Sequence, residues 1–462
     1  MSFWVLTDKG PAHLVTDHER PIFFVSTEQQ PLACKTLQKS SIQFQCKPLK
    51  LNTFHHEPVT AFYFQTLDSF YRAQNQLKHN KITVYESDIC LHDRFLMERF
   101  VRGGMMFTGN PIQKQGYTRY TDVHIKPAEY TPSLNVLSLD IECSSKGELY
   151  SIGLSGMASD VVLMIGSPNA QDQSDNDWIK WVDNEKALLE TLVTAVEKRD
   201  PDIIIGWNVI NFDFRLLLKR AEVHGLRLHL GRSRRPCSWR HRVGDTSQGF
   251  ITIPGRMVID GIDALKAATY QFESFSLDFV AQHLLGKGKA TEDIDNRMAT
   301  IAHDFLHNKV KLAKYNLEDC RLVEEIFSHT RLLDYLRLRS QMTGLELDRM
   351  GGSVAAFTNL YLPQLHRAGY IAPNLPEDGG LASPGGYVMN SRPGLYRNVL
   401  VLDFKSLYPS IIRTFKVDPM GLIEGLKKPD DGIPGFLGAH FSRTQHFLPD
   451  IITSLWCTLP SH

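Results

Sequence analysis

Apolar and polar residues alternate along residues 136–142, VLSLDIE. A strand with this pattern would direct its leucines and isoleucine to one face, while Asp140 and Glu142 project together from the other. At about 3.4 Å per residue, their Cα atoms would lie about 6.8 Å apart. Like charges this close raise each other's pKa, and a divalent cation removes that penalty. The alternative is an ordinary solvated strand end.

A continuous apolar run, residues 203–205, predicts a second strand that is buried on both faces and stopped by Gly206. A helix is expected to begin near Asn211 and to end at Gly225, a residue type common at helix C-termini. Asp213 would then lie in the first helical turn, at the sheet edge where α/β proteins bind ligands. The alternative is that Asn211 or Asp213 only caps the helix.

A third segment, residues 301–329, predicts one long helix that carries Tyr315 and Asp319. Residues four apart share a helical face, with Cβ atoms about 5 to 6 Å apart. A tyrosine hydroxyl in that place can orient a water molecule beside a carboxylate. The alternative is an ordinary surface pair.

The patterning also predicts the domain organisation. Short alternating runs fill the first part of the chain, strand-like and helix-like segments alternate in the middle, and residues 371–386 are rich in proline and glycine. After this linker, a strand at 399–404, a turn and a helix are expected. The expected segments are a β-rich domain at 1–127, an α/β domain at 128–345, a connecting segment at 346–386 and a further unit at 387–462.

Composition narrows the class of protein. A length of 462 residues is about three times a typical domain of ~150 residues, and 42% hydrophobic residues exclude a disordered or fibrous chain. The sequence contains no run near the ~18 apolar residues of a membrane span. Its N-terminus lacks the features of a signal peptide, and its seven cysteines are scattered. We therefore expect a cytoplasmic protein with reduced thiols.

Charge is uninformative in sum, because 51 basic residues balance 51 acidic ones. The distribution of charge is informative, because residues 223–244 contain several arginines beside Trp239 and lack aspartate and glutamate. One interpretation is a solvated loop. The other is a surface for DNA phosphates, with an aromatic ring for base stacking. The arginines of this candidate DNA surface are Arg232, Arg234, Arg235, Arg240 and Arg242.

Taken together, a DxE strand, an NxxxFD turn and a YxxxD helix, in this order, resemble the three motifs of the DEDD exonucleases, tyrosine subtype. The resemblance implies an RNase H-like domain that hydrolyses terminal phosphodiesters 3′→5′ with two divalent cations, magnesium or manganese. It further implies that Asp140, Glu142 and Asp319 hold one ion, that Asp140 touches the second, and that Asp213 acts through its water shell. Tyr315 would position the nucleophile.

The resemblance also gives roles to residues around this set. Asn208 and Phe212 would contact the end of the DNA strand.

The segment DFKSLYPSII, residues 403–412, matches the first catalytic motif of the family B DNA polymerases at every defined position. The resemblance implies that Asp403 binds a polymerase metal ion and that Tyr408 excludes a ribose 2′-hydroxyl. It also implies that backbone amides around Lys405, Ser406 and Leu407 cradle a deoxynucleoside triphosphate. Gly385 and Gly386 correspond to a DNA-contacting loop of the family, although Ser383 replaces its tyrosine.

Segments such as GRMVIDGIDALK and DRMGGSVAAF resemble a bacterial branch of family B, damage-inducible repair polymerases with proofreading. The likeness extends to about Trp456. The later family motifs, KxxxNSxYG and YGDTDS, are missing, so we expect a truncated chain with an incomplete palm. One aspartate cannot clamp both ions of a nucleotidyl-transfer site, so we expect no polymerisation by this chain.

Three hypotheses follow. In the leading one, the chain is part of a family B polymerase that acts in DNA replication and repair, and it retains at most 3′→5′ exonuclease activity. The alternatives are a self-standing DEDD exonuclease and an inert DNA-binding remnant. Expected partners are a single-stranded 3′ end or primer-template DNA and, in the complete protein, a deoxynucleoside triphosphate and a sliding clamp. No membrane partner is expected.

Overall fold

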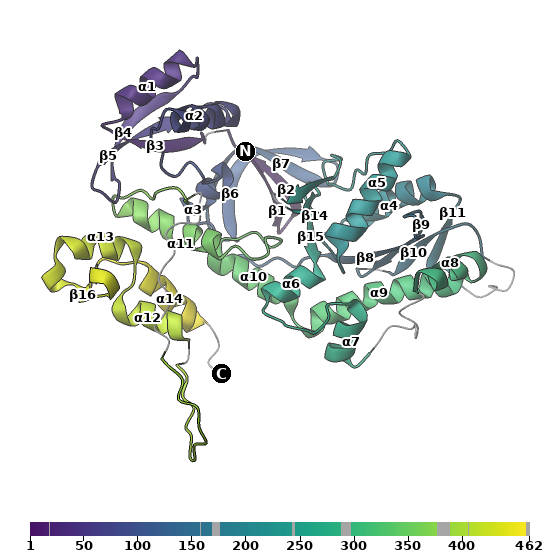
Figure 1. The fold of residues 1–462 in the computed structure, drawn as a ribbon. Helices are drawn as coiled ribbons and strands as arrows, with labels where there is room; N and C mark the ends of the chain where they lie inside the picture. Colours follow the sequence, from purple (N-terminus) through teal and green to yellow (C-terminus); the bar gives the residue numbers. More distant parts are fainter. Residues whose placement is uncertain are drawn as a thin grey trace. The chain divides into compact units, whose positions relative to one another are not determined.

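A computed structural model describes residues 1–17, 19–157, 159–168, 176–242, 245–287, 297–376, 389–404 and 406–458 (Figure 1). The chain forms two compact units. Unit 1 comprises Met1–Thr16, Gly103–Gln341 and Leu345–Gly352, and unit 2 comprises Asp17–Arg102, Met342–Gly344 and Ser353–His462. Each unit is therefore built from several separate stretches of the sequence, whereas continuous domains were expected. In particular, the first strand of the chain pairs with the second, and the second pairs with β7 (Tyr117–Pro127), so both belong to unit 1.

Unit 1 is organised around a mixed six-stranded sheet of order β11-β10-β9-β8-β12-β15. The strands are β8 (Val136–Cys143), β9 (Leu149–Ser155), β10 (Val161–Ile165), β11 (Ile179–Val182), β12 (Ile203–Gly206) and β15 (Met257–Asp260). β8, β12 and β15 run parallel, and β9 is antiparallel to β8 and β10. The carboxyl ends of the three parallel strands therefore meet at one edge of the sheet.

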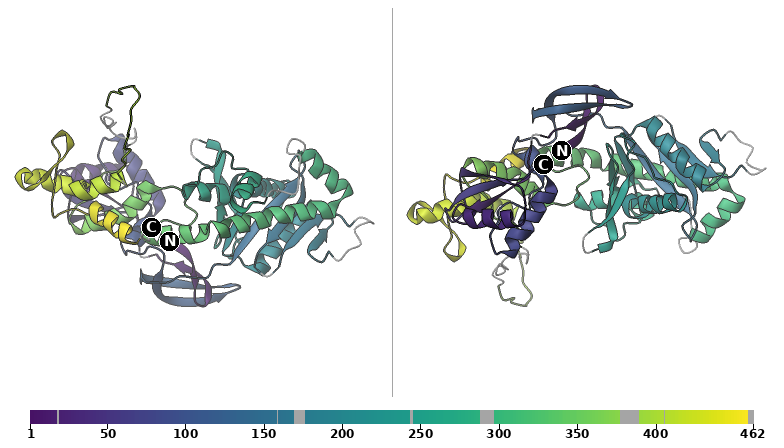
Figure 2. Two further views of the ribbon diagram at one scale, coloured as in Figure 1. Left: turned by 90° about the horizontal axis from the view of Figure 1, so that it is seen from below. Right: turned by 90° about the horizontal axis from the view of Figure 1, so that it is seen from above.

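The two faces of this sheet are covered by different helices, as Figure 1 shows. On one face, Leu137, Leu139 and Ile141 pack in a core with α4 (Glu185–Arg199) and α5 (Arg215–Val223), which confirms the expected apolar face of β8. The long helix α9 (Lys309–His329) covers the other face and runs along the sheet in Figure 2. Its buried side includes both Tyr315 and Asp319.

Two expected helices have different bounds from those predicted. The helix expected over 301–329 is two helices, α8 (Arg297–His307) and α9, because the Asn308 side chain accepts a hydrogen bond from the Lys311 backbone and begins a new helix. The helix expected from Asn211 begins instead as a π-helical turn, Val209–Phe214, which continues into α5. π-Helical turns frequently occur at functional sites.

The rest of unit 1 flanks this sheet. A four-stranded sheet contains β1 (Ser2–Thr7), β2 (Gly10–Val15), β7 and β6 (Met105–Lys114), in that order. A hairpin is formed by β13 (Ser238–Arg242) and β14 (Asp245–Thr252). The remaining helices are α6 (Gly261–Ala267), α7 (Leu277–Leu285) and α10 (Leu332–Thr343), whose last residues belong to unit 2.

Unit 2 contains a three-stranded sheet of order β3-β5-β4 and two groups of helices. The strands are β3 (Ile22–Ser26), β4 (Gln45–Asn52) and β5 (Pro58–Tyr63). Phe23, Phe62 and Phe70 build the core beneath α1 (Gln30–Lys39) and α2 (Leu67–His79). The other helices are α3 (Leu91–Met97), α11 (Ser353–Arg367), α12 (Leu407–Phe415), α13 (Pro419–Lys427) and α14 (Leu448–Thr458).

The strand expected at residues 399–404 is not formed. A strand needs a neighbour for its backbone hydrogen bonds, and no strand in the described part of the chain pairs with this segment. Its large apolar side chains are exposed, with Val401 at 90%. Two short strands, β16 (Ile433–Pro434) and β17 (His440–Phe441), follow α13 and pair with each other. Among the described residues, no helix is long and apolar enough to cross a bilayer.

A buried ionic cluster joins α11 to α3 and its preceding loop within unit 2. The His366 Nδ1 atom lies 2.6 Å from Glu98 Oε1, and its Nε2 atom lies 2.8 Å from Glu86 Oε1. Arg94 donates to the other Glu86 oxygen at 2.9 Å, and the Ala372 backbone donates to Oε1. Burial alone would lower the pKa of His366, but its hydrogen bonds to both glutamates outweigh burial and raise it to about 9.

This cluster predicts a loss of stability at alkaline pH. With a folded pKa of about 9 and an ordinary value near 6.5, His366 stabilises unit 2 fully below pH ~6.5 and progressively less as pH rises through about 9. Urea unfolding is measured below pH ~6.5 and again above pH ~9. His366→Gln should reduce the difference between these two unfolding free energies by about 3 kcal/mol. The exposed-site control His79→Gln should leave it unchanged. An unchanged pH dependence in His366→Gln would contradict this role.

Candidate active site

Three carboxylates meet at the carboxyl end of β8. Asp140 and Glu142 project from this strand, and Asp319 comes from α9. One oxygen atom from each lies within 4.8 Å of those of the other two. Glu142 and Asp319 are only 4% and 2% exposed, whereas Asp140 is half-buried. The fold thus brings together side chains that are up to 179 positions apart in the sequence numbering (319 − 140).

Asp213 lies next to this cluster, in the π-helical turn after β12. Its Oδ1 atom accepts a hydrogen bond of 3.1 Å from the Ile141 backbone, between the two β8 carboxylates. Burial first, and the negative charge of Asp140 second, raise the pKa of Asp213 well above its usual value. All four predicted acids are therefore in one region, although Asp213 is outside the tight group of three.

Polar contacts fix α9 on the sheet and position Asp319. The Asn316 side chain, which is fully buried, donates to Asp140 Oδ2 at 2.7 Å and accepts from the Ser151 hydroxyl at 3.0 Å. The Ser138 hydroxyl donates to the Cys320 carbonyl at 2.9 Å. Sequence reasoning missed Asn316. The available signal was its position three residues before Asp319, which places both on one helical face.

Gly153 permits this close approach of α9. It lies opposite Asp140 in the β8–β9 pairing. A Cβ atom at this position would be 2.8 Å from Cys320 Sγ and 3.1 Å from the Asn316 carbonyl oxygen. Any larger residue would therefore push α9, and Asp319 with it, away from Asp140.

Asp260, at the end of β15, supports the turn that carries Asp213. One oxygen atom caps α6 by accepting from the Ile262 backbone at 3.0 Å, and the other is 3.4 Å from the Ile210 backbone nitrogen. Burial first, and the charge of Asp263 second, raise the pKa of Asp260 to about 6. The sequence reasoning assigned Asp260 no role.

The other predicted exonuclease residues lie on the same elements. Tyr315 is one turn before Asp319 on α9 and is 7% exposed. Asn208 adopts the left-handed conformation, with φ 59°, and its carbonyl accepts from the Phe212 backbone at 2.9 Å. The Phe212 ring is 46% exposed and so is accessible to a ligand.

The side chains of the carboxylate cluster suit divalent cations that prefer oxygen ligands. The atoms that gather here are carboxylate oxygens, the ligands that magnesium and manganese prefer. Burial first, and the charge of Asp140 second, raise the pKa of Asp213, and a bound cation would offset both effects. Chemically, such a site suits the hydrolysis of a phosphodiester.

The predicted arginine surface is only partly available to DNA. The Arg232 side chain is 6% exposed and forms ion pairs with Asp200 at 2.9 Å and Asp202 at 2.7 Å. These two acids lie between α4 and β12, so the guanidinium is part of the interior of unit 1. This position argues against the predicted phosphate contact for Arg232. Arg234 is 66% exposed and pairs with Glu197.

Two other arginines of the set are exposed, and one is not described. Arg235 and Arg240 are exposed, and Arg240 lies over the Phe250 ring at 5.4 Å. The side chain of Arg242 is outside the described part of the structure.

Trp239 attaches the β13–β14 hairpin to the turn that carries Asp213. Its Nε1 atom donates to the Ile210 carbonyl at 3.1 Å, and the Arg215 guanidinium lies 5.0 Å from its ring centre. The Gly249 backbone also donates to the Asn211 side chain at 2.9 Å. Since Trp239 is half-buried in these contacts, it positions the hairpin and is not a free platform for a base.

The residues of the predicted polymerase motif lie in unit 2. Asp403 is exposed on an extended segment, and Ser406 adopts φ 55° before α12 begins at Leu407. Leu407 and Tyr408 are 43% and 77% exposed. The two glycines of the predicted DNA-contacting loop, Gly385 and Gly386, lie outside the described residues.

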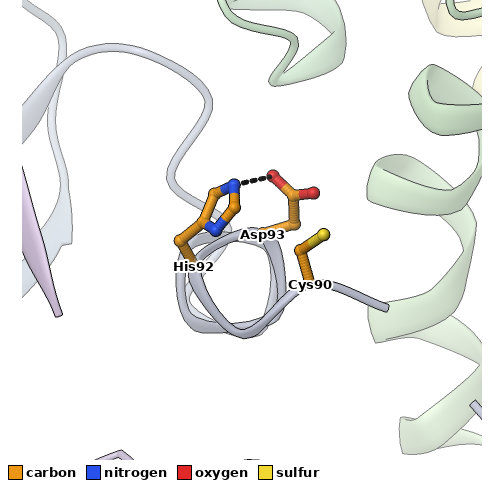
Figure 3. Close-up of side chains that lie close together, drawn as sticks. All are labelled: Cys90, His92 and Asp93. Carbon is orange, nitrogen blue, oxygen red and sulfur yellow. Dashed lines mark ion pairs between the residues drawn. The ribbon is translucent and has the colours of Figure 1, made fainter. Parts of the chain in front are cut away.

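A second group of potential metal ligands lies at the start of α3 in unit 2 (Figure 3). It consists of Cys90, His92 and Asp93, and His92 Nε2 lies 3.6 Å from Asp93 Oδ1. Cys90 and His92 are exposed, and all three belong to one turn. Neighbours in sequence meet in this way without long-range folding, so the group gives no evidence of a metal site.

Two parts of the chain match known protein families. Residues 82–280 match the family described as DNA polymerase family B, exonuclease domain. Residues 350–431 match DNA polymerase family B. Asp140, Glu142 and Asp213 lie in the first match, and the polymerase motif at 403–412 lies in the second.

Similar proteins are found at the level of sequence and of fold. The chain is 44% identical to DNA polymerase II of Escherichia coli over 459 residues, which cover 99% of this chain and 58% of that protein. It is 29% identical over 354 residues to DNA polymerase 1 of Pyrococcus abyssi, covering 72% of this chain and 44% of that protein.

A solved family B DNA polymerase from Pyrobaculum calidifontis has the same fold. The TM-score is 0.75 at 20% identity, and the match covers 99% of this chain and 62% of that structure. The chain thus spans a little over half the length of the bacterial relative, and its expected likeness to a bacterial branch is confirmed. This chain belongs to DNA polymerase family B and contains that family's exonuclease domain.

Proposed function

We propose that this chain removes nucleotides from the 3′ end of DNA by metal-dependent hydrolysis, in an RNase H-like domain of the DEDD type. The observation that carries the proposal is the meeting of Asp140, Glu142 and Asp319 within 4.8 Å, beside the buried Asp213. Four acids from three separate segments would repel one another in a purely structural role. Their common position at the carboxyl edge of the parallel strands favours a ligand site.

Each acid has a distinct role in the proposal. Asp140, Glu142 and Asp319 hold one divalent cation, magnesium or manganese, and Asp140 also contacts a second. When bound, such a pair of cations activates water and stabilises the leaving 3′ oxygen. Asp213 is hydrogen-bonded to the β8 backbone and acts on this site through water.

Other residues orient the reactants. Tyr315, one helical turn from Asp319, orients the attacking water through its hydroxyl. Asn208 and the exposed Phe212 ring contact the terminal nucleotides. Arg234, Arg235 and Arg240 contact phosphates further along the strand, because they are the described exposed members of the arginine set.

The functions of the complete protein are part of the same proposal. Proofreading during replication and repair would couple this exonuclease to a palm domain whose first motif contains Asp403, Ser406, Leu407 and Tyr408. Primer-template DNA, a deoxynucleoside triphosphate and a sliding clamp would be its partners. The 44% identity to an E. coli protein supports a bacterial, cytoplasmic setting.

The proposal is tested with single-stranded DNA that carries a label on its 3′-terminal nucleotide. The purified chain should release the label as a mononucleotide with Mg²⁺ and should release none with EDTA. A 5′-terminal label should stay on a ladder of shortened strands. Failure of the folded chain to release the 3′ label with either Mg²⁺ or Mn²⁺ would favour the inert remnant instead.

Asn316 provides a further prediction about this site. Asn316→Leu removes the hydrogen bond that holds Asp140 Oδ2, while keeping a side chain of similar volume. Loss of such support for a metal ligand typically costs 10- to 100-fold in metal affinity or activity. We expect a rate reduction of this size, partly restored by higher Mn²⁺ concentration. A matched change on the exposed side of α9, Lys314→Leu, should have little effect.

The result that would contradict this role is equally specific. If Asn316→Leu kept the wild-type metal dependence, Asn316 would contribute only to packing.

A further inference from the structure

Two cysteines from different elements of unit 2 face each other, and neither belongs to the carboxylate site. Cys34 lies on α1 and Cys46 on β4, with their Sγ atoms 4.0 Å apart. Cys46 is exposed and Cys34 is half-buried. A disulfide bond is about 2.05 Å long, and a change of rotamer moves a sulfur atom by about 3 Å. The 4.0 Å between the two sulfur atoms is therefore within the reach of a rotamer change.

The side chain of Gln30 directs its amide towards both sulfur atoms. Its Nε2 atom is 3.1 Å from Cys34 Sγ and 3.8 Å from Cys46 Sγ. An N–H donor between two sulfurs stabilises the negative charge of a thiolate, which is the reactive form of cysteine. Burial raises the pKa of Cys34 despite this contact. The exposed Cys46 is therefore the sulfur that a dissolved oxidant meets first.

We propose that Cys34 and Cys46 form a redox-active dithiol, which small disulfides such as oxidised glutathione convert into an intramolecular disulfide. In the first step, the Cys46 thiolate attacks one sulfur of the oxidant and releases one thiolate. In the second step, the Cys34 thiolate attacks the Cys46 sulfur and releases the other. Two protein thiols are oxidised, the small disulfide is reduced to two thiols, and the two protein protons pass to them.

The bond would link α1 to the strand β4 and close the loop between them. Reversible disulfides in reducing compartments usually serve redox sensing rather than stability. This modification site does not depend on the proposed nuclease activity, because none of its residues belongs to the carboxylate site. Cys90, which is exposed just before α3, offers an internal reference.

The test exposes the complete chain to defined ratios of reduced and oxidised glutathione. Free thiols are then blocked, and tryptic peptides are identified by mass spectrometry. Lys35 and Lys39 lie between the two cysteines, so a disulfide holds two tryptic peptides together until it is reduced. The cross-link should survive at least about tenfold more reduced glutathione than the mixed disulfide on Cys90, because its second thiol is already in place.

Single serine variants complete the test. In Cys34→Ser, Cys46 should carry glutathione and respond to reduction as Cys90 does, with no linked peptides. The proposal is overturned if wild-type Cys46 carries glutathione while Cys34 stays free. It is also overturned if the cross-link never forms, or if it is reduced as easily as the mixed disulfide on Cys90.

Discussion

Asp140→Ala is expected to lower the rate of 3′-terminal nucleotide release by about a thousandfold or more. Asp140 connects several parts of the site: it belongs to the group within 4.8 Å, it accepts a hydrogen bond from Asn316, and its charge acts on Asp213. In the proposed site Asp140 is a ligand of both cations, so its loss should remove several kcal/mol of transition-state stabilisation. About 4 kcal/mol corresponds to a thousandfold in rate.

The measurement is the 3′-label assay under single-turnover conditions, with thermal unfolding as a check of folding. Asp183→Ala is the matched control, because this acid is exposed in the same unit outside the cluster. It should retain the wild-type rate. Equal rates for the wild type and Asp140→Ala would mean that the nuclease activity comes from elsewhere or from a contaminant.

Asp418→Ala is expected to destabilise the C-terminal part of unit 2 by about 3 kcal/mol or more. The Asp418 carboxylate is 1% exposed and caps α13 by accepting from the Gly421 backbone at 2.6 Å. Its oxygens also accept from the Phe447 and Leu448 backbones, at 3.1 and 2.8 Å, and from the Tyr361 hydroxyl at 2.9 Å. Truncation would leave the buried Gly421 and Tyr361 donors without this acceptor, which is the costly case, and the partly buried Phe447 and Leu448 amides would lose it as well.

Urea unfolding together with hydrogen exchange over α13 and α14 measures this loss. The exposed Asp430→Ala in the same unit is the control and should change stability by less than about 0.5 kcal/mol. A similarly small effect of Asp418→Ala would show that water replaces the carboxylate.

Local patterns predicted the parts of the site that depend on one element. Alternation along β8 was enough to place Asp140 and Glu142 on the face opposite the apolar core. Helical spacing placed Tyr315 and Asp319 together on α9. The apolar run before Gly206 gave the position of β12. These predictions succeeded because the period of one buried element fixes the direction of its side chains.

Features that depend on pairing between elements could not be predicted. The close approach of α9 needs Gly153 opposite Asp140, which follows from strand register rather than from local sequence. Arg232 was predicted to lie on a DNA surface, but it forms ion pairs with Asp200 and Asp202. These partners precede it by 32 and 30 positions in the chain, so the local sequence around Arg232 does not reveal them. The apolar segment 399–404 has the composition of a strand, yet a strand forms only with a neighbour.

Mn²⁺ binding to the intact chain measures directly whether Asp140, Glu142, Asp213 and Asp319 form a metal centre. Electron paramagnetic resonance of free Mn²⁺ should show two ions taken up per chain by the wild type and by Asp183→Ala. Asp140→Ala should lose this uptake while it remains folded. If the wild type bound no more Mn²⁺ than Asp140→Ala, the carboxylate cluster would not be a metal centre.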